Sequence, residues 1–483
     1  MKTDKDVRED ADISRVADRL PLTISAAARA LRDGTITSRE LTEKTIARAD
    51  ALAERLGVYI VRLDDEARQA ADRADEQFAR GVEIGPLQGI PLGIKDNIST
   101  SDAPTTAQSL VLESGFGGGQ DAPVVARLRA AGAVLTGKTT TMEFAVGMPD
   151  PQKPFPIPRN PFSTDHWTGG SSSGTGAGVA SGLFLGGLGT DTGGSIRMPA
   201  AWCGISGFKQ TFGRVPKSRI VPLGFSYDHV GPMTRTAYDC GLMLNVLAGH
   251  DESDACSVDR PVDDYVAGLD GNIEGLRVGI DLSFLDSPLC DPATAEGVHA
   301  AIAVLREAGV VISDAPLPYR DELKDATMLG FVMEAFAYHR ENLKSRWEDY
   351  GAETRLSIAT GALFSSGDYV QMQRLRRAAV REMEEMFAHI DIHLTPTAMT
   401  GGLPLATQDF EQYIDVVNTG YWNGVGYPAI SVPMGQDATG LPLGLQLAGR
   451  PFEESTVLRI ADAFQRRTSH HLAESDIVKE SIA

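Results

Sequence analysis

The stretch from Gly169 to Pro199 constrains the possible folds of this chain more than any other. It holds two Gly-Gly-Ser turns on either side of a run of small residues, Ala177 to Gly189. Glycine at this density allows backbone conformations with positive φ and lets a substrate or another segment approach where a Cβ would clash. Apolar residues inside the run, among them Leu183 and Leu188, are atypical of a flexible Gly/Ser linker. We therefore expect a folded segment that presents serine hydroxyls and backbone N–H groups together.

The composition is typical of a folded, soluble protein and excludes several classes of function. Of the 483 residues, 42% are hydrophobic and 23% are charged, and the net charge is −20. Because such a surface repels phosphate backbones and anionic membranes, we expect neither a nucleic-acid partner nor a membrane partner. The charged segment Met1 to Asp12 lacks the apolar core of a signal peptide, so we expect a cytoplasmic protein. The histidines and cysteines show no metal-ligand spacing, and neither a metal nor a cofactor is predicted.

Local patterns in the first hundred residues predict helices and a strand. Thr37-Ser38-Arg39-Glu40 is a capping box, and the helix that it opens is expected to end at Gly57. A strand is predicted over 58–63 and an alanine-rich helix over 64–80.

The later part of the chain is expected to be mostly helical and then to return to strands. Helices are predicted over 237–248, over most of 293–390 and over 455–464, and strands over 276–280, 391–397, 426–434 and 441–449. The break between the last two strands has the glycine chemistry of a hairpin.

An apolar strand that ends in Lys95 is the second unusual feature. It reads Gly89-Ile-Pro-Leu-Gly-Ile-Lys95-Asp-Asn97. Burial of a lysine is costly unless the amine is paired or neutral. Lys95 is therefore either half of a structural salt bridge or an amine held neutral to act as a base beside hydroxyl groups.

Two short motifs match known catalytic patterns by coincidence. Gly132 to Thr139 fits the phosphate-binding pattern Gly-x4-Gly-Lys-Thr, but the intervening residues read as a strand and a helix precedes them, which is the wrong context. Gly170 to Gly174 fits Gly-x-Ser-x-Gly, which in an α/β-hydrolase would make Ser172 the nucleophile. No histidine stands out as its base, and this alternative leaves Lys95 without a function.

Taken together, several separate strings resemble the amidase signature family over nearly the whole chain. They are Gly89 to Asn97, Gly137-Lys-Thr-Thr-Thr-Met-Glu-Phe144, Gly169-Gly-Ser-Ser-Ser-Gly174, Gly189-Thr-Asp-Thr-Gly-Gly-Ser-Ile-Arg-Met-Pro199 and Gly426-Tyr-Pro-Ala-Ile-Ser-Val-Pro433. The resemblance implies an α/β fold with one large twisted mixed β-sheet that helices cover on both faces. It implies a single domain over residues 1–483, divided into a helical N-terminal arm (8–80), a signature core (85–250), a mostly helical region that forms the substrate pocket (255–390) and a C-terminal return to the sheet (391–470).

The resemblance also implies a Ser-Ser-Lys catalytic triad. The family's nucleophile falls on Ser195, its bridging serine on Ser171, which follows a cis peptide bond, and its lysine on Lys95. A neutral lysine can remove the Ser195 proton through the bridging hydroxyl, because a serine is a poor nucleophile until a base acts on it.

Other site residues follow from the same resemblance. The N–H groups of Thr192, Gly193 and Gly194, with that of Ser195, are expected to form the oxyanion hole. Asp191 and Arg197 are expected to support these groups from behind. The remaining candidates are expected to contact the substrate: Met148, Gly169, Gly170, Tyr421 and Trp422.

The predicted activity is hydrolysis of carboxylic amide C–N bonds, extending to aryl amides, esters or carbamates, by a stand-alone homodimeric enzyme. The alternative is the glutaminase subunit of a tRNA-dependent amidotransferase. Two departures argue against that alternative. The loop Met148 to Pro158 is rich in proline, and the region Leu317 to Gly361 lacks an Arg-Tyr-Asp-Gly string. The natural substrate is not predicted.

Overall fold

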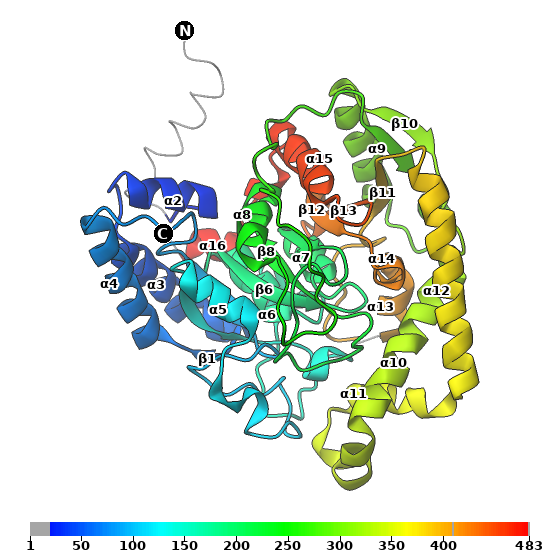
Figure 1. The fold of residues 1–483 in the computed structure, drawn as a ribbon, viewed down its shortest axis with the longest axis horizontal. Coiled ribbons are helices and arrows are strands. Elements are labelled where there is room, and N and C mark those ends of the chain that lie inside the picture. Colours follow the sequence, from blue (N-terminus) through cyan, green and yellow to red (C-terminus); the bar gives the residue numbers. More distant parts are fainter. Residues whose placement is uncertain (1–19, 408–409, 482–483) are drawn as a thin grey trace.

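The computed structural model describes residues 20–407 and 410–481, and a mixed β-sheet runs through its centre (Figure 1). The sheet has 11 strands within these residues, in the order β1-β3-β2-β6-β8-β7-β12-β13-β11-β9-β10. Its strands are β1 Tyr59–Arg62, β2 Pro91–Lys95, β3 Val134–Thr139, β6 Gly186–Asp191, β7 Ser206–Lys209, β8 His229–Thr234, β9 Arg277–Ile280, β10 Val311–Asp314, β11 Ile392–Pro396, β12 Ala429–Gln436 and β13 Pro442–Gly449. A separate two-stranded sheet pairs β4 Arg159–Asn160 with β5 Ser163–Trp167.

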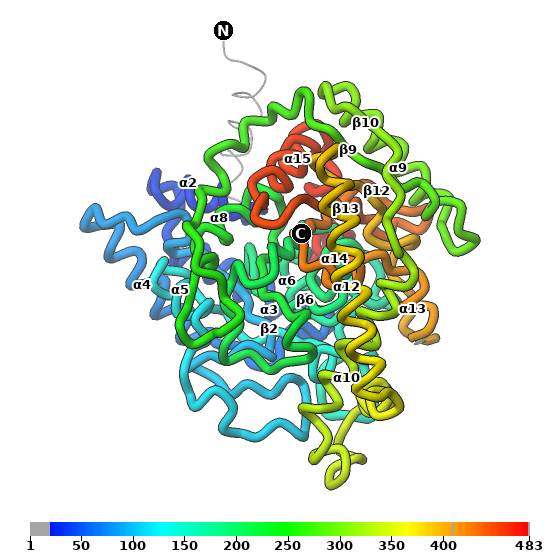
Figure 2. The backbone as a smooth tube through the Cα atoms, turned by 45° about the vertical axis from the view of Figure 1, so that its right-hand side comes forward, coloured from blue at the N-terminus to red at the C-terminus, as the bar shows by residue number. Residues whose placement is uncertain are grey.

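Helices are distributed along the whole described chain. They are α2 Ile24–Arg32, α3 Ser38–Leu56, α4 Asp64–Ala79, α5 Pro123–Ala130, α6 Ser173–Ser181, α7 Arg197–Cys203, α8 Ala237–Leu247, α9 Pro292–Glu307, α10 Arg320–Ser345, α11 Ala352–Thr360, α12 Ser366–Phe387, α13 Phe410–Val416, α14 Gly420–Val425, α15 Glu454–Arg467 and α16 Asp476–Glu480. Figure 1 places α2, α3 and α4 on one side of the molecule and α10 and α12 on the opposite side, and Figure 2 again separates α2 and α4 from α10 and α12.

Both faces of the sheet are covered by helices, as two adjacent glycines of β6 demonstrate. A Cβ built on Gly186 would meet Ile24 of α2 and Met243 of α8, whereas a Cβ on Gly187 would meet Thr175 of α6. Successive residues of a strand point to opposite faces, so these helices lie on opposite sides of the sheet. The predicted fold class, an α/β fold with a large mixed sheet, is confirmed.

Most of the predicted elements are present, with boundaries that shift by a few residues. The capping box forms as predicted, because the Thr37 hydroxyl accepts from the Glu40 N–H and the Glu40 carboxylate accepts from the Thr37 N–H. Gly57 ends α3 with a left-handed φ of 62°. The long region predicted as helical contains α9 to α12, with the short strand β10 inserted between α9 and α10.

The glycine-rich stretch is folded and closely packed. It forms α6, a turn and β6, and the helix residues from Ser173 to Ser181 are all buried. A Cβ on Gly178 of α6 would overlap the ring of Phe184. Glycine therefore serves here to bring the helix against the segment that leads into β6, and not to provide flexibility.

The sheet brings the predicted catalytic segments to one edge. Strands β2, β3 and β6 are parallel neighbours, with Ile94 opposite Leu188. Lys95 is the last residue of β2, and Asp191 is the last residue of β6. Because the carboxyl ends of parallel strands meet at the same edge of a sheet, the segments that follow these strands lie side by side there.

Candidate active site

Lys95 lies at this edge, fully buried, beside two hydroxyl groups. Its Nζ is 2.7 Å from Ser171 Oγ and 2.7 Å from Thr190 Oγ1. Thr190 also accepts a 3.0 Å hydrogen bond from Asn97 Nδ2. Burial lowers the pKa of Lys95 to about 7, although the charges of Asp191 and Asp228 oppose this shift. Lys95 is therefore an amine that is close to half neutral at pH 7.

Ser171 lies in the turn that precedes α6 and is 2% exposed. The peptide bond between Gly170 and Ser171 is cis, as the resemblance predicts. The next residue, Ser172, donates its backbone N–H to the Ser195 carbonyl over 3.1 Å. This bond ties the turn of Ser171 to the turn of Ser195, and the two serines line one cavity.

Ser195 is half-buried and its hydroxyl faces this cavity. In the described part of the chain no hydrogen bond involves Ser195 Oγ, so the link from Ser171 Oγ to Ser195 Oγ is not formed here. A hydroxyl rotates about its Cα–Cβ bond, and hydrogen bonds between catalytic groups often tighten only when a substrate is bound. The structure thus brings Lys95 and Ser171 into contact and places Ser195 beside them.

The turn that carries Ser195 is shaped by the Asp191 carboxylate. Its Oδ1 accepts from the Gly194 N–H over 2.8 Å, and its Oδ2 accepts from the Ile196 N–H over 3.2 Å. Gly194 has a φ of +130°, and a Cβ at this position would overlap the Thr419 hydroxyl. Only glycine fits this conformation and this space without strain.

Three of the four predicted oxyanion donors have no acceptor in this structure. The N–H of Gly194 is engaged with Asp191. The N–H groups of Thr192, Gly193 and Ser195 make no hydrogen bond to any described residue. They are therefore available to a ligand oxygen, whereas the Gly194 N–H is already used to hold the turn.

Arg197 neutralises Asp191 inside the protein. Both side chains are 0% exposed and the Nη2–Oδ1 distance is 3.0 Å. Burial alone would raise the pKa of Asp191, but the charge and hydrogen bonds of Arg197 hold it well below its ordinary value. The guanidinium also donates to Thr419 O, Asn423 Oδ1 and Gln446 Oε1, which come from the C-terminal part of the chain.

The cavity beside Ser195 is small and mostly apolar. Its volume is about 60 Å³. Apolar and aromatic residues line most of it: Met142, Val146, Trp167, Leu223, Met328, Phe331, Phe410, Tyr413, Ile414 and Val417. Lys324 of α10 is the one charged residue among the described residues that line this cavity. The sequence prediction assigned the pocket to the helical region but named none of these residues.

Of the five predicted substrate contacts, only Gly170 lines this cavity. Met148 is 5% exposed and packs in the core with Trp167 and Trp202, and Trp422 is fully buried. Gly169 accepts from the Ser173 hydroxyl through its carbonyl, and Tyr421 lines a neighbouring cavity. Met148 and Trp422 are large apolar side chains that the core buries, so packing accounts for these two positions.

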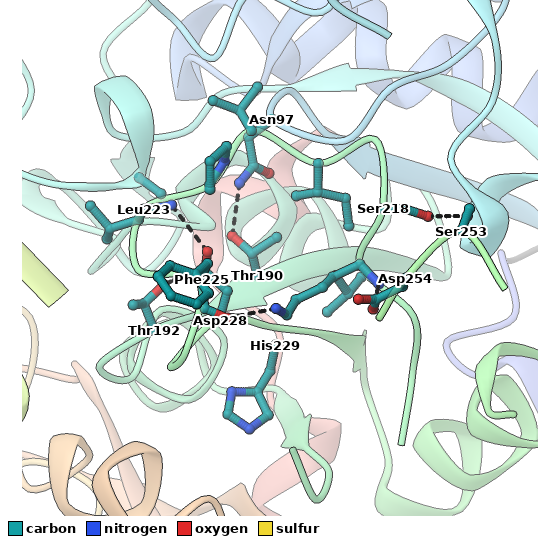
Figure 3. Close-up of a pocket in the computed structure, with 16 residues that line it drawn as sticks. Asn97, Thr190, Thr192, Ser218, Leu223, Phe225, Asp228, His229, Ser253 and Asp254 are labelled. Atoms are coloured by element: carbon teal, nitrogen blue, oxygen red, sulfur yellow. Dashed lines mark hydrogen bonds between the residues drawn. The ribbon is translucent and has the colours of Figure 1, made fainter. Parts of the chain in front are cut away.

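A second cavity, of about 160 Å³, lies beside Thr190 (Figure 3). Asn97, Thr190 and Asp228 line it, and Figure 3 shows the hydrogen bond from Asn97 to Thr190. The Asp228 carboxylate accepts from the Thr192 hydroxyl over 2.5 Å, and burial raises its pKa to about 6. Thr190, which contacts Lys95, and Asn97, which donates to Thr190, thus line a polar cavity that the sequence did not predict.

Neither coincidental motif forms the site that its pattern suggests. Residues 134–139 of the phosphate-loop pattern are strand β3, and Lys138 is buried in an ion pair with Asp96 at 3.2 Å. Ser172 Oγ donates to the Thr190 carbonyl over 3.1 Å, and no histidine in the described ranges bonds to it. Both alternatives are therefore unsupported by the geometry.

Within 20–407 and 410–481 no group of three or more His, Cys, Asp or Glu side chains is arranged to hold a metal ion. Within the same ranges no helix has both the length and the apolar character needed to cross a membrane.

Comparison with known proteins agrees with this geometry. A family model described as Amidase matches residues 40–458. One component of the glutamyl-tRNA(Gln) amidotransferase of Chloroflexus aggregans is 39% identical, over 95% of this chain and 99% of that protein. Two solved structures are similar over most of their length: the peptide amidase of Stenotrophomonas maltophilia (29% identity, TM-score 0.79, covering 92% of this chain and 96% of that one) and a bacterial aryl acylamidase (27%, 0.84, 94% and 98%).

The fold, the family match and the solved neighbours define a hydrolase of the amidase class. The chain belongs to the amidase signature family. Its relatives include stand-alone amidases as well as a component of an amidotransferase, so membership identifies the type of bond that is attacked but not the substrate.

Proposed function

We propose that this protein is a stand-alone serine amidase that cleaves carboxylic amides through an acyl-enzyme on Ser195. The observation that carries the proposal is the buried contact of Lys95 Nζ with Ser171 Oγ at 2.7 Å, together with the cavity that Ser171 and Ser195 both line. Burial keeps much of the Lys95 amine neutral near pH 7. A neutral amine joined to a hydroxyl beside a second hydroxyl is the arrangement that activates a serine nucleophile.

In the first half of the reaction, Ser195 Oγ forms a bond to the amide carbonyl carbon. Its proton passes to Ser171, whose own proton passes to Lys95. The negative charge that develops on the carbonyl oxygen is stabilised by the free N–H groups of Thr192, Gly193 and Ser195, contacts of a kind worth about 3–4 kcal/mol each. The C–N bond then breaks, and the proton on Lys95 returns through Ser171 to the leaving nitrogen.

In the second half, water attacks the ester on Ser195. Its proton travels to Lys95 by the same route, and the C–O bond to Ser195 breaks as the serine regains a proton. The products are a carboxylic acid and an amine or ammonia. Asp191 and Arg197 take no proton in this scheme, because they hold the turn that presents Ser195 and the N–H groups.

The glutaminase of a tRNA-dependent amidotransferase remains the second candidate, and the 39% identity to an amidotransferase component over 95% of the chain favours it. Glutamine carries an ammonium group beside its carboxylate, and a site for it needs an acidic or strongly polar acceptor. In the described part of the chain, no Asp or Glu lines the cavity beside Ser195. We therefore favour the stand-alone amidase, in which esters, carbamates and aryl amides are further substrates.

A substrate screen tests the proposal. Purified protein is assayed for product release from primary amides, anilides, carbamates, esters and glutamine, with the Ser195→Ala and Ser171→Ala variants beside it. Ser345→Ala, on the exposed surface of α10, is the matched serine control. We expect hydrolysis by the wild type and the control, and a loss of about a thousandfold or more in both active-site variants. Wild-type turnover by Ser195→Ala would refute the mechanism, and turnover of glutamine alone would favour the second candidate.

The proposal also covers domain organisation, oligomeric state, location and partners. We propose one domain spanning 1–483, a homodimer in solution, a cytoplasmic location and no nucleic-acid partner, which the net charge of −20 supports. Light scattering of the purified protein measures the assembly. A monomer by mass, or co-purification with a different protein chain, would overturn this part.

A further inference from the structure

Lys324 is a half-buried lysine that lines the cavity of Ser195. It belongs to α10, in the first turns of the helix, and lines both the cavity of Ser195 and a neighbouring cavity of about 210 Å³. Its ammonium makes no hydrogen bond and no ion pair with the described residues. Burial lowers the pKa of Lys324, and the nearby charges of Asp415, Asp325 and Asp321 offset this shift only in part. A ligand that brings a negative charge therefore favours the ammonium form.

The charged residues that act on Lys324 are Arg320, Asp321, Asp325 and Asp415, and none of these four lines the cavity of Ser195. Arg320, one turn earlier, pairs with Asp321 at 3.0 Å and donates to Ser283. Asp415 is exposed and lines the neighbouring cavity but not the cavity of Ser195. A molecule bound beside Ser195 therefore meets the positive charge of Lys324 without meeting a carboxylate.

The size of the cavity limits what can reach Lys324. Its volume of about 60 Å³ is only a few times the minimum of about 10–15 Å³ that holds one water molecule, so the cavity favours a small acyl group. The carbonyl group of a bound amide lies at Ser195 and at the free N–H groups. The rest of the acyl chain must then be short, and apolar side chains surround it until it reaches the ammonium.

We propose that Lys324 binds a carboxylate at the far end of the acyl chain, so that the preferred substrates are monoamides of short dicarboxylic acids. This inference rests on the proposed amidase function. Succinamate is a short member of this class, since two methylenes and a carboxylate follow its amide carbonyl. The apolar walls contact the methylenes, and Lys324 contacts the carboxylate as the one cation of the lining.

The first test compares succinamate with 4-methylpentanamide, a neutral amide of similar shape. Ammonia release gives kcat/KM for both, and the ratio of the two values is compared in the wild type, Lys324→Met, Lys324→Arg and Lys344→Met. Lys344 is the matched control, because it lies on the same helix with 60% of its side chain exposed. We expect the wild type to prefer succinamate by at least about tenfold, Lys324→Met to lose that preference, and Lys324→Arg and Lys344→Met to keep it. An equal ratio in the wild type and Lys324→Met would overturn the inference.

The second test separates this inference from the proposed function. Calorimetry measures succinamate binding to the Ser195→Ala protein and to the Ser195→Ala, Lys324→Met protein, where no turnover is needed. We expect the second change to weaken binding at least about tenfold. Binding that is undetectable in the first protein, or equal in both, would overturn the carboxylate site. A failure to hydrolyse any amide would instead count against the proposed function.

Discussion

The pKa of about 7 at Lys95 makes the rate of amide hydrolysis depend on pH in a defined direction. The amine must be neutral to accept the proton that leaves Ser195 through Ser171. With a pKa of about 7, the neutral fraction rises from about one-tenth at pH 6 to about nine-tenths at pH 8. We therefore expect kcat/KM to rise about tenfold between pH 6 and pH 8 and to level off above that range.

Substitution of Lys95 tests the same reasoning. Arginine stays charged throughout this range, so Lys95→Arg is expected to remove the rise and to lower kcat/KM by about 10²- to 10⁴-fold, the usual contribution of a general base. Lys95→Met is expected to be equally inactive. The assay is ammonia release from a primary amide at substrate concentrations well below KM, across pH 5.5 to 9.5 in steps of about half a unit.

The loss of kcat/KM in these variants reports on catalysis only if the variants remain folded. The pKa of Lys95 is lower in the folded chain than in the unfolded chain, where it is about 10.4. Between pH 7 and about 10.4 the unfolded chain binds more protons, so the stability contribution of Lys95 rises with pH across that window. Lys95→Met removes the burial penalty of the amine and also its contacts with Ser171 and Thr190, effects of opposite sign. We expect its free energy of unfolding at pH 7 to lie within about 2 kcal/mol of the wild type.

Ionisation of Asp228 could also make kcat/KM rise between pH 6 and pH 8, because burial raises the pKa of this carboxyl to about 6. Its negative charge also raises the pKa of Lys95. If Lys95 carries the profile, Asp228→Asn keeps the rise and moves its midpoint to lower pH. If Asp228 carries it, the rise disappears in that variant. A flat profile in the wild type, with bond cleavage shown to be rate-limiting, would refute the role of Lys95 as a base.

Three further predictions concern the support of the site. Arg197→Met leaves Asp191 as a buried, unpaired carboxylate, so we expect the free energy of unfolding to fall by about 3–5 kcal/mol in a denaturant titration; an unchanged midpoint would contradict this. Gly194→Ala forces a Cβ onto the Thr419 hydroxyl at a φ of +130°, and we expect kcat/KM to fall about a hundredfold, which wild-type kinetics would disprove. Thr37→Ala removes a helix cap far from the site and should cost about 1 kcal/mol of stability by thermal unfolding, with kcat/KM unchanged.

Features that depend on neighbours in sequence were predictable from the sequence. The capping box at Thr37, the helix end at Gly57 and the strand that ends in Lys95 each follow from a few adjacent residues, and each is present. The contact of Lys95 with Ser171 joins residues 76 positions apart and came only from the resemblance. Thr190 was within a quoted string, but nothing local in the sequence indicates that its hydroxyl lies against the lysine.

The lining of the cavity could not be predicted, because it depends on how distant helices pack. Phe331 and Lys324 lie on one helix whose other residues pack against α11, α12 and α14. From the sequence, an aromatic residue in such a helix is equally compatible with the core, and Trp422 shows the difficulty: it was expected at the substrate and is fully buried. Which face of a helix meets the cavity is decided by its tertiary contacts.

The Asp191 carboxylate links the turn that carries Ser195 to the C-terminal part of the chain. It holds the turn through Gly194 and Ile196, and it remains ionised inside the protein mainly because Arg197 neutralises it. Arg197 in turn donates to Thr419, Asn423 and Gln446, which lie 222 to 249 residues further along the chain. The turn that carries the free N–H groups beside Ser195 is therefore supported by contacts with the C-terminal part of the chain, including Asn423 of α14 and Gln446 of β13.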